Sequence, residues 1–595
     1  MNDAVLRFTF GPVQPFIAEA RRTSDLFAGS RILAELARAA VRALQQDGAQ
    51  LVYPADLSSD PPNVIVARVP WSQAEASAQR AAQALRDRWL QFADEALQQL
   101  ARLVPLDEAF RDHWQRQTAD PWELYWAAAP IERDDYATAF RRATAAVAAL
   151  KKTRTFDQQV EAGPKDALSG TRAALARAGE DPRSFWRTVR RRPEGARLVG
   201  EHERLDAVSA VKRFFDFDVS FPSLPTIAAR PFVQEAVRQA PQALETYRDA
   251  FDLLVTSLGE EPRRYRRVGL GTDRFPYDGS FLYEATLEWP ALLEELGLEP
   301  SAVEPRRATA EGSLRRARHA LTELVRAVGR RPSRYVAVLV LDGDSMGRWL
   351  SEAVGTGGEA AHRAISQRLA AFAARAKELV ENRFANAAAV YLGGDDVVAL
   401  VPAEEAVPLA LALAEAFHRI TEGRTASAGI AIAHWLEPLG DLLRAARAAE
   451  RAAKRLPRKR AVAVELQPRG GEIVRAVAEY EWLKSLQFED LVERFRRDGP
   501  GSLSGRVPTD LRLAARVLPR ADEAFRAVLA RSVTRQGHWP AGTVAERDRL
   551  VERLHAFARA YDALRDDSAG AVPEGPAQLA DWLALARFLA RGGGE

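Results

Sequence analysis

The sequence predicts an α+β protein with two ferredoxin-like palm domains, a helical or irregular middle module and a C-terminal α-helical bundle. Strands and long amphipathic helices follow one another in the order β-α-β-β-α-β near the N-terminus, and the same logic returns after residue 330. Apolar residues recur with helical spacing almost throughout the last part of the chain. These observations place the domains at 1–150, 151–330, 331–470 and 471–595.

The first palm begins with an apolar strand at residues 4–10, which Gly11-Pro12 ends. Its other elements are expected as a helix over 14–44, strands near 50–54 and 62–68, a helix over 71–102 and a strand at 123–129. None of these strands ends in acidic residues, so we expect no metal site in this palm. Residues 151–200 are polar, basic and interrupted by glycine and proline, which is typical of a linker or irregular module.

The second palm carries acidic residues in two separate segments. Residues 335–341 form a buried-strand pattern that delivers Asp342 and Asp344 at its end. Gly393-Gly394-Asp395-Asp396 stands between two apolar runs, which predicts a β-hairpin with a Gly-Gly turn and two carboxylates at its tip. The alternative is a plain surface turn, because this tetrapeptide is good turn chemistry by itself.

Carboxylates packed into one cleft repel one another, so the arrangement is costly unless a cation fills it. Oxygen-only ligands suit Mg²⁺ or Mn²⁺ rather than zinc. Two such ions can activate an attacking hydroxyl and stabilise a leaving pyrophosphate. The glycines Gly393 and Gly394 permit the turn and leave room for a triphosphate.

Two further segments are candidates for phosphate contact. Ser345-Met346-Gly347 opens a helical stretch, and the free N–H groups of a helix N-terminus are suited to phosphate. A strand-like run at 425–433 leads into a helix over 441–455 that carries Lys454, whose ammonium could reach a triphosphate. A solvent-facing lysine is the alternative.

The 595-residue chain has no cysteine, which excludes disulfides, a thiolate zinc site and a thiol nucleophile. It has no long apolar run and no leader, so we expect a cytoplasmic protein without a membrane partner. The net charge is only +3, yet arginines occur in clusters that suit a nucleic-acid backbone. The eight histidines show no metal-ligand spacing and are expected to be structural.

Five short motifs together resemble one known family: GPVQPFIAEAR at 11–21, DLFAGS at 25–30, LDGDSMG at 341–347, GGDD at 393–396 and ARAAERAAK at 446–454. The chain is similar to the large subunit of type III CRISPR effector complexes in its Cmr-type (III-B) form. The first two motifs resemble that family's first palm, the next two its catalytic GGDD palm, and the last its phosphate-contacting helix.

The resemblance implies an activity in antiviral defence. Family members convert ATP into cyclic oligoadenylate when the guide CRISPR RNA of the complex pairs with target RNA. Asp342, Asp395 and Asp396 would then be the catalytic ligands of Mg²⁺ or Mn²⁺, with Asp344 a weaker candidate. Nucleotide-binding residues would be Asp344, Ser345, Met346, Gly347, Gly393, Gly394 and Lys454. The implied partners are the other Cmr-type subunits, both RNAs and ATP.

The chain departs from many relatives in two places. It contains no His-Asp dipeptide and its first palm begins near residue 4, so we expect no HD nuclease activity. Residues 163–170 resemble a zinc knuckle in which Asp166 and Ser169 stand where cysteines would be. A carboxylate and a hydroxyl are poor zinc ligands, so we expect no zinc there.

Two other functions stay open. The same palm could serve a template-dependent polymerase or a diguanylate-type cyclase, although fingers and thumb segments are not obvious around 331–470. Alternatively, the chain is a non-catalytic scaffold of the ribonucleoprotein with a vestigial site. Metal-dependent binding of ATP would separate an enzyme from a scaffold.

Overall fold

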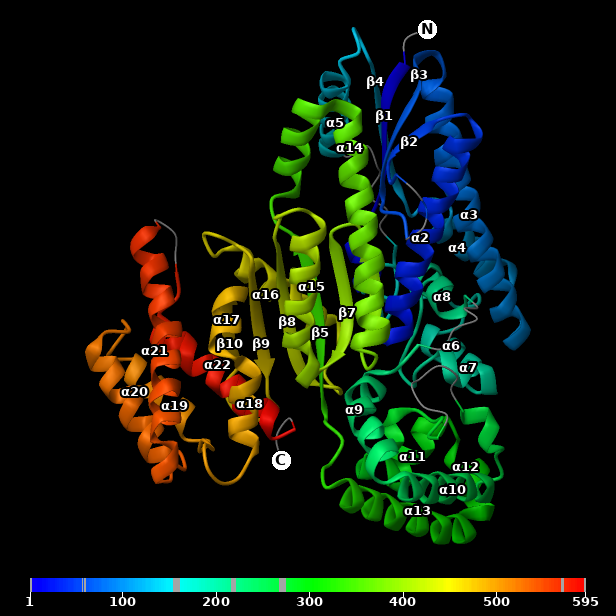
Figure 1. Ribbon diagram of the computed structural model, residues 1–595. Coiled ribbons are helices and arrows are strands. Elements are labelled where there is room, and N and C mark those ends of the chain that lie inside the picture. Colours follow the sequence, from blue (N-terminus) through cyan, green and yellow to red (C-terminus); the bar gives the residue numbers. More distant parts are fainter. Residues whose placement is uncertain are drawn as a thin grey trace.

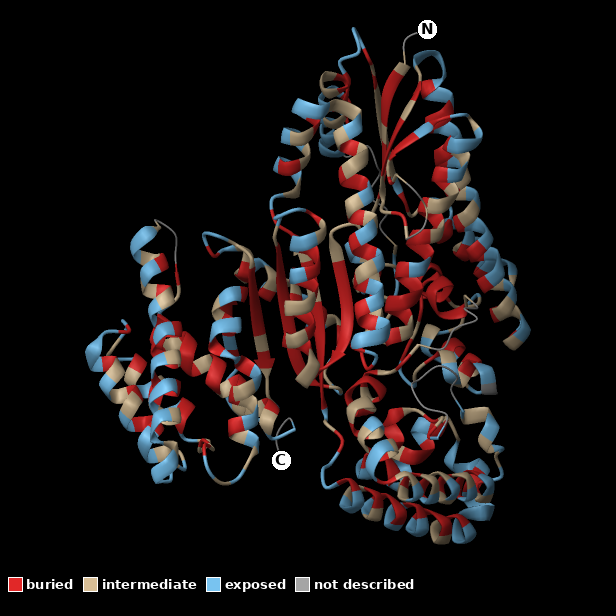
Figure 2. Cartoon of the chain, in the orientation of Figure 1, coloured by how far each residue is buried: buried red, intermediate tan, exposed pale blue. Residues whose placement is uncertain are grey.

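The computed structural model describes residues 3–55, 57, 60–153, 161–215, 221–266, 274–568 and 572–592. Its described strands form two sheets, of four and six strands, with helices packed around both (Figure 1). The strands of the larger sheet are buried between helices (Figure 2). Within the described ranges, no helix is both long and apolar enough to cross a membrane.

The first palm has the ferredoxin-like order predicted for it. Its elements are β1 (Asp3–Gly11), α1 (Gln14–Ala18), α2 (Thr23–Gln46), β2 (Gln50–Tyr53), β3 (Val64–Pro70), α3 (Ala74–Leu103), α4 (Glu108–Thr118), β4 (Glu123–Pro130) and α5 (Tyr136–Thr153). The antiparallel sheet has the order β2-β3-β1-β4. Alternate residues of β1 serve two cores: Leu6 and Phe8 pack with α2 and α3, whereas Val5 packs with α5.

The helix predicted over 14–44 is two helices, α1 and α2. The chain breaks between them because the Asp25 carboxylate accepts the backbone N–H groups of Arg21 (2.9 Å) and Arg22 (3.0 Å). These bonds satisfy N–H groups at the start of α2 and hold the preceding residues outside the helix.

The middle module is more helical than its sequence suggests. It contains α6 (Pro182–Arg190), α7 (Pro193–Leu198), α8 (Ala207–Phe214), α9 (Leu224–Gln239), α10 (Pro241–Ser257), α11 (Trp289–Leu296), α12 (Pro300–Val303) and α13 (Arg307–Val328). Residues 151–200, predicted to be irregular, therefore include two helices; residues 154–160 lie outside the described part. The Asp181 carboxylate caps α6 by accepting the Ser184 N–H, a local signal that the basic composition obscured.

The knuckle-like segment is organised by one carboxylate. Asp166 accepts the backbone N–H groups of Leu168 (2.8 Å), Ser169 (2.8 Å) and Gly170 (3.0 Å). The Ser209 hydroxyl adds a bond of 3.1 Å, which ties the turn to α8. The carboxylate oxygens of Asp166 thus accept the hydrogen bonds that hold the turn closed.

The second palm repeats the topology of the first. Its elements are β5 (Tyr335–Gly343), α14 (Met346–Glu378), β6 (Ala388–Gly393), β7 (Asp396–Pro402), α15 (Ala406–Ile420), β8 (Ala426–His434), α16 (Leu439–Lys454), β9 (Ala461–Gln467) and β10 (Val474–Glu479). The sheet order is β10-β9-β8-β5-β7-β6. Its β8-β5-β7-β6 part matches β4-β1-β3-β2, so the two palms share one strand order.

The helical pattern expected after residue 470 does not hold at its start, because residues 474–479 form β10. It pairs antiparallel with β9 along its length, from Val474 opposite Leu466 to Glu479 opposite Ala461. A short apolar run fits a buried strand or a helix equally well, and here the open edge of β9 decides. The second sheet consequently extends to Glu479, past the predicted boundary at 470.

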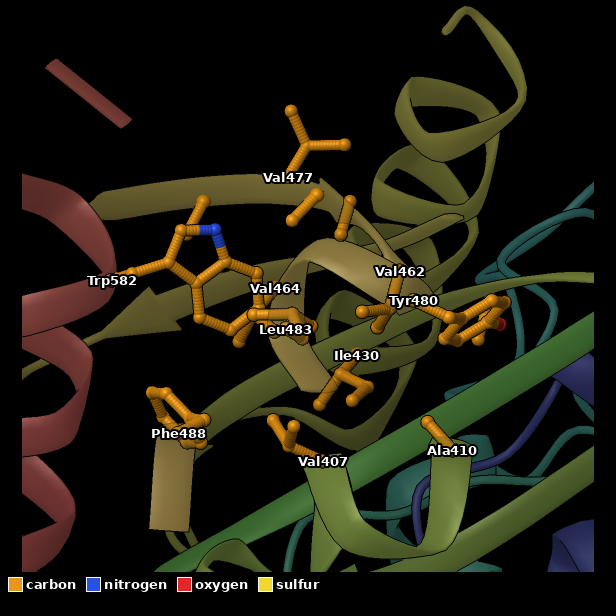
Figure 3. Close-up of a cluster of buried hydrophobic side chains, with 14 of the residues drawn as sticks. Val407, Ala410, Ile430, Val462, Val464, Val477, Tyr480, Leu483, Phe488 and Trp582 are labelled. Atoms are coloured by element: carbon orange, nitrogen blue, oxygen red, sulfur yellow. The ribbon is translucent and has the colours of Figure 1, made fainter. Parts of the chain in front are cut away.

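The C-terminal bundle contains α17 (Tyr480–Leu486), α18 (Phe488–Arg496), α19 (Val507–Ala515), α20 (Glu523–Gln536), α21 (Val544–Asp567) and α22 (Gly575–Ala590). It shares a core with the second palm. Trp582 of α22 and Phe488 lie with Val464 and Val477 of the sheet (Figure 3). The bundle is thus docked on the palm through buried apolar side chains.

Helix α14 connects the acidic strand of the second palm to the first palm. Its helical course is interrupted at Gly358 (φ 58°, ψ −142°). Beyond this kink, the Arg363 guanidinium donates to the Leu51 carbonyl, and the Ser366 hydroxyl accepts the Ala55 N–H at 2.7 Å. The kink thereby lets the helix start beside the acidic strand, contact the first palm just after Gly358 and end in the core of the second palm, where Phe372 and Ala376 pack.

Replacing Gly358 with alanine is expected to lower the free energy of unfolding by about 1–3 kcal/mol, because this backbone conformation is open only to glycine. Gly355→Ala is the matched control: Gly355 lies in the same helix, and an added Cβ would meet nothing within 4 Å. The control is expected to be neutral or stabilising by up to about 1 kcal/mol. Chemical denaturation of both variants measures the difference, and equal stabilities would contradict the prediction.

Candidate metal and nucleotide site

Three of the four predicted acidic residues converge. Asp342 lies near the end of β5, Asp395 in the β6–β7 turn and Asp396 at the start of β7. One carboxylate oxygen from each lies within 4.8 Å of the others. Strands β5 and β7 pair with Leu341 opposite Val397, which brings the two acidic ends together.

The hairpin turn differs by one residue from the predicted Gly-Gly turn. Gly393 pairs with Asp396, so the two turn residues are Gly394 and Asp395. Gly394 takes a φ of +65°, which favours glycine. Gly343 is also required, because a Cβ there would lie 2.7 Å from Cγ of Met346 and 3.1 Å from Cβ of Asp395. Met346 therefore covers the end of β5, and glycine at 343 lets the hairpin approach it.

The electrostatics of the triad favour a cation. Burial raises the pKa of Asp395 above its usual range. Burial, followed by the charges of Asp395 and Glu450, raises the pKa of Asp396 to about 7. Carboxylates this close are ionised together only at a cost, which a divalent ion would offset. An all-oxygen donor set of this spacing fits Mg²⁺ or Mn²⁺.

This raised pKa predicts the pH dependence of the metal-free protein. A carboxyl group whose folded pKa lies above its unfolded value of about 3.9 stabilises the fold at low pH, and this contribution is lost as the pH rises from about 4 to about 7. With EDTA present, raising the pH from about 5 to about 8 should lower the melting temperature more in the wild type than in Asp396→Asn. Equal pH slopes in both proteins would contradict the prediction, and added Mg²⁺ should reduce the difference.

Lys454 is the last residue of α16 and contacts the triad directly. Its ammonium forms ion pairs with Asp342 and with Glu450 (2.9 Å to Glu450). The helix is pressed against β8 at Gly429, where a Cβ would lie 2.1 Å from the Ala446 carbonyl oxygen and 2.1 Å from the Glu450 nitrogen. Glycine at this position sets how near Lys454 comes to the acidic strand.

The sequence reasoning missed Glu450 and Arg447. Both act on the electrostatics of Asp396: Glu450 raises its pKa and Arg447 lowers it. They precede Lys454 by four and seven residues, and this spacing places all three on one helix face. This helical spacing relative to Lys454 is the signal in the sequence from which Glu450 and Arg447 could have been predicted.

Asp344 is not part of the triad in the described structure. Its buried carboxylate accepts the hydroxyls of Thr425 (2.8 Å) and Ser427 (2.9 Å) and the Arg460 N–H (3.1 Å). These bonds join the end of β5 to β8 and to the segment before β9. The carboxylate of Asp344 thus connects segments of the fold, and the nucleotide contact expected from the sequence stays a prediction.

The predicted phosphate segment starts α14 as expected. Ser345 occupies the left-handed region (φ 57°, ψ 32°), and no side chain caps the helix N-terminus. The Lys459 ammonium donates to the Ser345 hydroxyl at 2.9 Å. An added Cβ on Gly347 would meet nothing within 4 Å, so that side of the turn is open. Lys459 is a second lysine at this end of the site that the sequence analysis did not single out.

Two tyrosines flank the hairpin, and they too were missed. Burial, together with the charges of Asp395 and Asp396, raises the pKa of both Tyr53 and Tyr391. Tyr391 belongs to β6 itself, whereas Tyr53 ends β2 of the first palm.

Two ferredoxin-like palms in one chain, the second with an acidic triad at a strand end and a hairpin turn, define a palm protein of the nucleotidyltransferase-like class. Family profiles match twice: "Cas10/Cmr2, second palm domain" at residues 335–463, and "CRISPR-associated protein Cmr2, N-terminal" at residues 5–61. Both matched profiles describe Cas10/Cmr2 proteins, so the matched parts of the two palms are similar to that family.

A curated relative is similar to part of this chain in sequence, and two solved structures are similar to it in fold. The CRISPR system Cmr subunit Cmr2 of Pyrococcus furiosus is 30% identical over 200 residues, which is 29% of this chain and 23% of that protein. The match thus spans under a quarter of the relative's length. Chains of a type III-B Cmr-beta, in the apo state and bound to cognate target RNA, are similar in fold. Each has 12% identity and a TM-score of 0.59; they cover 91% and 89% of this chain, and 78% of each structure's chain is matched.

Proposed function

We propose that this protein is the large subunit of a type III-B CRISPR RNA-guided effector complex and that it synthesises cyclic oligoadenylate from ATP when target RNA is bound. The observation that carries the proposal is the convergence of Asp342, Asp395 and Asp396, whose carboxylate oxygens lie within 4.8 Å of one another. Its partners would be the other Cmr-type subunits, the guide CRISPR RNA and the target RNA, as in the complex bound to cognate target RNA that shares its fold.

The triad would hold Mg²⁺ or Mn²⁺, which supplies charge stabilisation at the reacting phosphate. The 3′-hydroxyl of one ATP would attack the α-phosphate of another. A 3′–5′ oxygen–phosphorus bond forms, the bond to the leaving pyrophosphate breaks, and the hydroxyl proton is released.

Lys454 and the start of α14 have separate tasks in this scheme. Lys454, now paired with Asp342, would turn its charge to the triphosphate once Asp342 binds metal. The free N–H groups at Met346 and Gly347 would bind phosphate oxygens. The glycines of the hairpin would permit the tight turn that presents Asp395 and Asp396 to the metal.

Mass spectrometry of reaction products tests the proposal. The protein, assembled with its guide complex and a matching target RNA, is incubated with all four nucleoside triphosphates and Mg²⁺ or Mn²⁺. Cyclic adenylates that disappear in Asp395→Ala/Asp396→Ala are the expected result. Linear or guanosine products would instead favour another palm-type polymerase or cyclase. No product with either metal, while target RNA is demonstrably bound, would favour the scaffold.

A further inference from the structure

Two phenol groups occupy the space that side chains on the hairpin glycines would fill. The Tyr53 hydroxyl lies 2.9 Å from the position of a Cβ on Gly394. The Tyr391 hydroxyl lies 2.0 Å from the position of a Cβ on Gly393. Both phenols therefore touch the turn that carries Asp395, one from each palm.

Neither hydroxyl has a hydrogen-bond partner among the residues that the structure describes. The neighbouring carboxylates also lack hydrogen-bond partners: over the described ranges, no other residue donates a hydrogen bond to the side chain of Asp395 or Asp396. Donors and acceptors that lack partners thus lie together at one turn.

Carboxylates that bind metal normally accept hydrogen bonds on their remaining oxygens, and these outer contacts fix the orientation of the ligand. We infer that the hydroxyls of Tyr53 and Tyr391 are the outer hydrogen-bond donors to the metal-binding hairpin carboxylates. They are positioning residues, since they act through Asp395 and Asp396. Because Tyr53 comes from the first palm, the first palm completes the metal site of the second. This inference rests on the metal site of the proposed function.

The chain around Tyr53 is fastened to the second palm, which gives its hydroxyl a fixed place. On one side, the Leu51 carbonyl accepts the Arg363 guanidinium; on the other, the Ala55 N–H donates to Ser366 at 2.7 Å. The Tyr53 ring stacks on His362, with centroids 6.4 Å apart and an interplanar angle of 20°. All three contacts are to α14, which begins at the acidic site. The geometry of the hairpin and the docking of the two palms are therefore coupled through one helix.

The test is the affinity of the full-length chain for Mn²⁺, titrated by electron paramagnetic resonance. Tyr53→Phe/Tyr391→Phe is expected to bind Mn²⁺ about 10- to 100-fold more weakly than the wild type, with smaller losses in each single variant. The melting temperature of the metal-free protein should stay nearly unchanged, because the phenyl rings remain and the hydroxyls have no described partner to lose. A merely structural role would move the melting temperature instead.

Tyr125→Phe is the matched control, since it removes a phenol on β4, at the opposite edge of the sheet β2-β3-β1-β4. Asp395→Asn serves as the reference for a lost ligand. Unchanged Mn²⁺ affinity in the double variant, beside a clear loss in Asp395→Asn, would overturn the role of the tyrosines and leave the metal site standing. If the wild type itself bound no Mn²⁺, the proposed metal site would fall, and this inference with it.

Discussion

Replacing Asp342 with asparagine is expected to lower nucleotidyl transfer by at least about 10³-fold, because the neutral amide binds a divalent ion weakly and cannot balance its charge. The fold should survive the change. Asp342 stands at a partly exposed strand end, and Lys454 keeps Glu450 as a partner 2.9 Å away. Mn²⁺ binding and product formation should therefore be lost together, with little change in melting temperature.

Lys454→Met separates the metal-binding step from the phosphate-binding step. In the metal-free protein the Lys454 ammonium neutralises Asp342, so it competes with an incoming cation for the same carboxylate. Removing it should leave Mn²⁺ affinity unchanged or raise it by a few fold, while the KM for ATP rises by about tenfold. The two variants are thus expected to change metal affinity in different directions while both reduce turnover.

The comparison needs Mn²⁺ titration and initial rates on the assembled complex, with ATP varied. Asp344→Asn is a useful third protein, because its carboxylate is held by Thr425 and Ser427 and lies outside the triad. Asp344→Asn should lower the free energy of unfolding more clearly than it lowers the affinity for Mn²⁺. Full activity in Asp342→Asn would remove this residue from the catalytic assignment.

The triad could be predicted from sequence because each part of it is local. A strand that ends in aspartate and a glycine hairpin that carries two more are recognised without knowing the rest of the fold. Asp344 shows where this reasoning stops. It follows the strand end by one residue, and its partners Thr425 and Ser427 come from the edge of β8, about 80 residues later. Which of two neighbouring aspartates faces the cleft depends on those distant hydroxyls.

The features that the sequence did not predict also depend on contacts between segments that are far apart in the sequence. Tyr53 reaches the hairpin from another domain, and no spacing in the sequence connects it to Gly394. Residues 474–479 are a strand because β9 offers an unpaired edge, which a short apolar run cannot reveal. Topology, by contrast, was predictable: both palms keep the strand order that their β-α-β-β-α-β pattern implies. Contacts between distant parts of the chain determined the position of Tyr53 and the pairing of β10 with β9.

The largest loss of stability is expected far from the acidic site, at a buried ion cluster that joins the first palm to the middle module. Arg213 of α8 is 1% exposed at its side chain and pairs with Asp25 of α2, which is 0% exposed, and with Glu203 at 2.6 Å. Asp25→Ala removes the anion that Arg213 contacts with two nitrogens and also the cap of α2. Breaking a buried pair in this way typically costs about 3–5 kcal/mol, since the remaining charge stays in a poorly solvated place.

The pH dependence of this loss identifies its cause. Burial opposes ionisation of Asp25, but the charge and hydrogen bonds of Arg213 outweigh it and lower the pKa below its usual value. A carboxylate with a lowered pKa stabilises the fold above its unfolded pKa of about 3.9, and this contribution disappears as the pH falls through the folded value. Urea denaturation should therefore show the full cost of Asp25→Ala near neutral pH and a smaller one in acid.

Asp47→Ala is the matched control, because Asp47 ends the same helix and forms an exposed pair with Arg80 at 2.8 Å. Exposed pairs contribute about 1 kcal/mol or less, so this variant should unfold almost as the wild type does. Similar losses in the two variants would mean that removing helix-end charges, rather than opening the buried cluster, sets the effect. If only Asp25→Ala lowers the free energy of unfolding, and if that loss becomes smaller in acid, the buried ion cluster holds the first palm and the middle module together. Its charges depend on one another because water does not reach them.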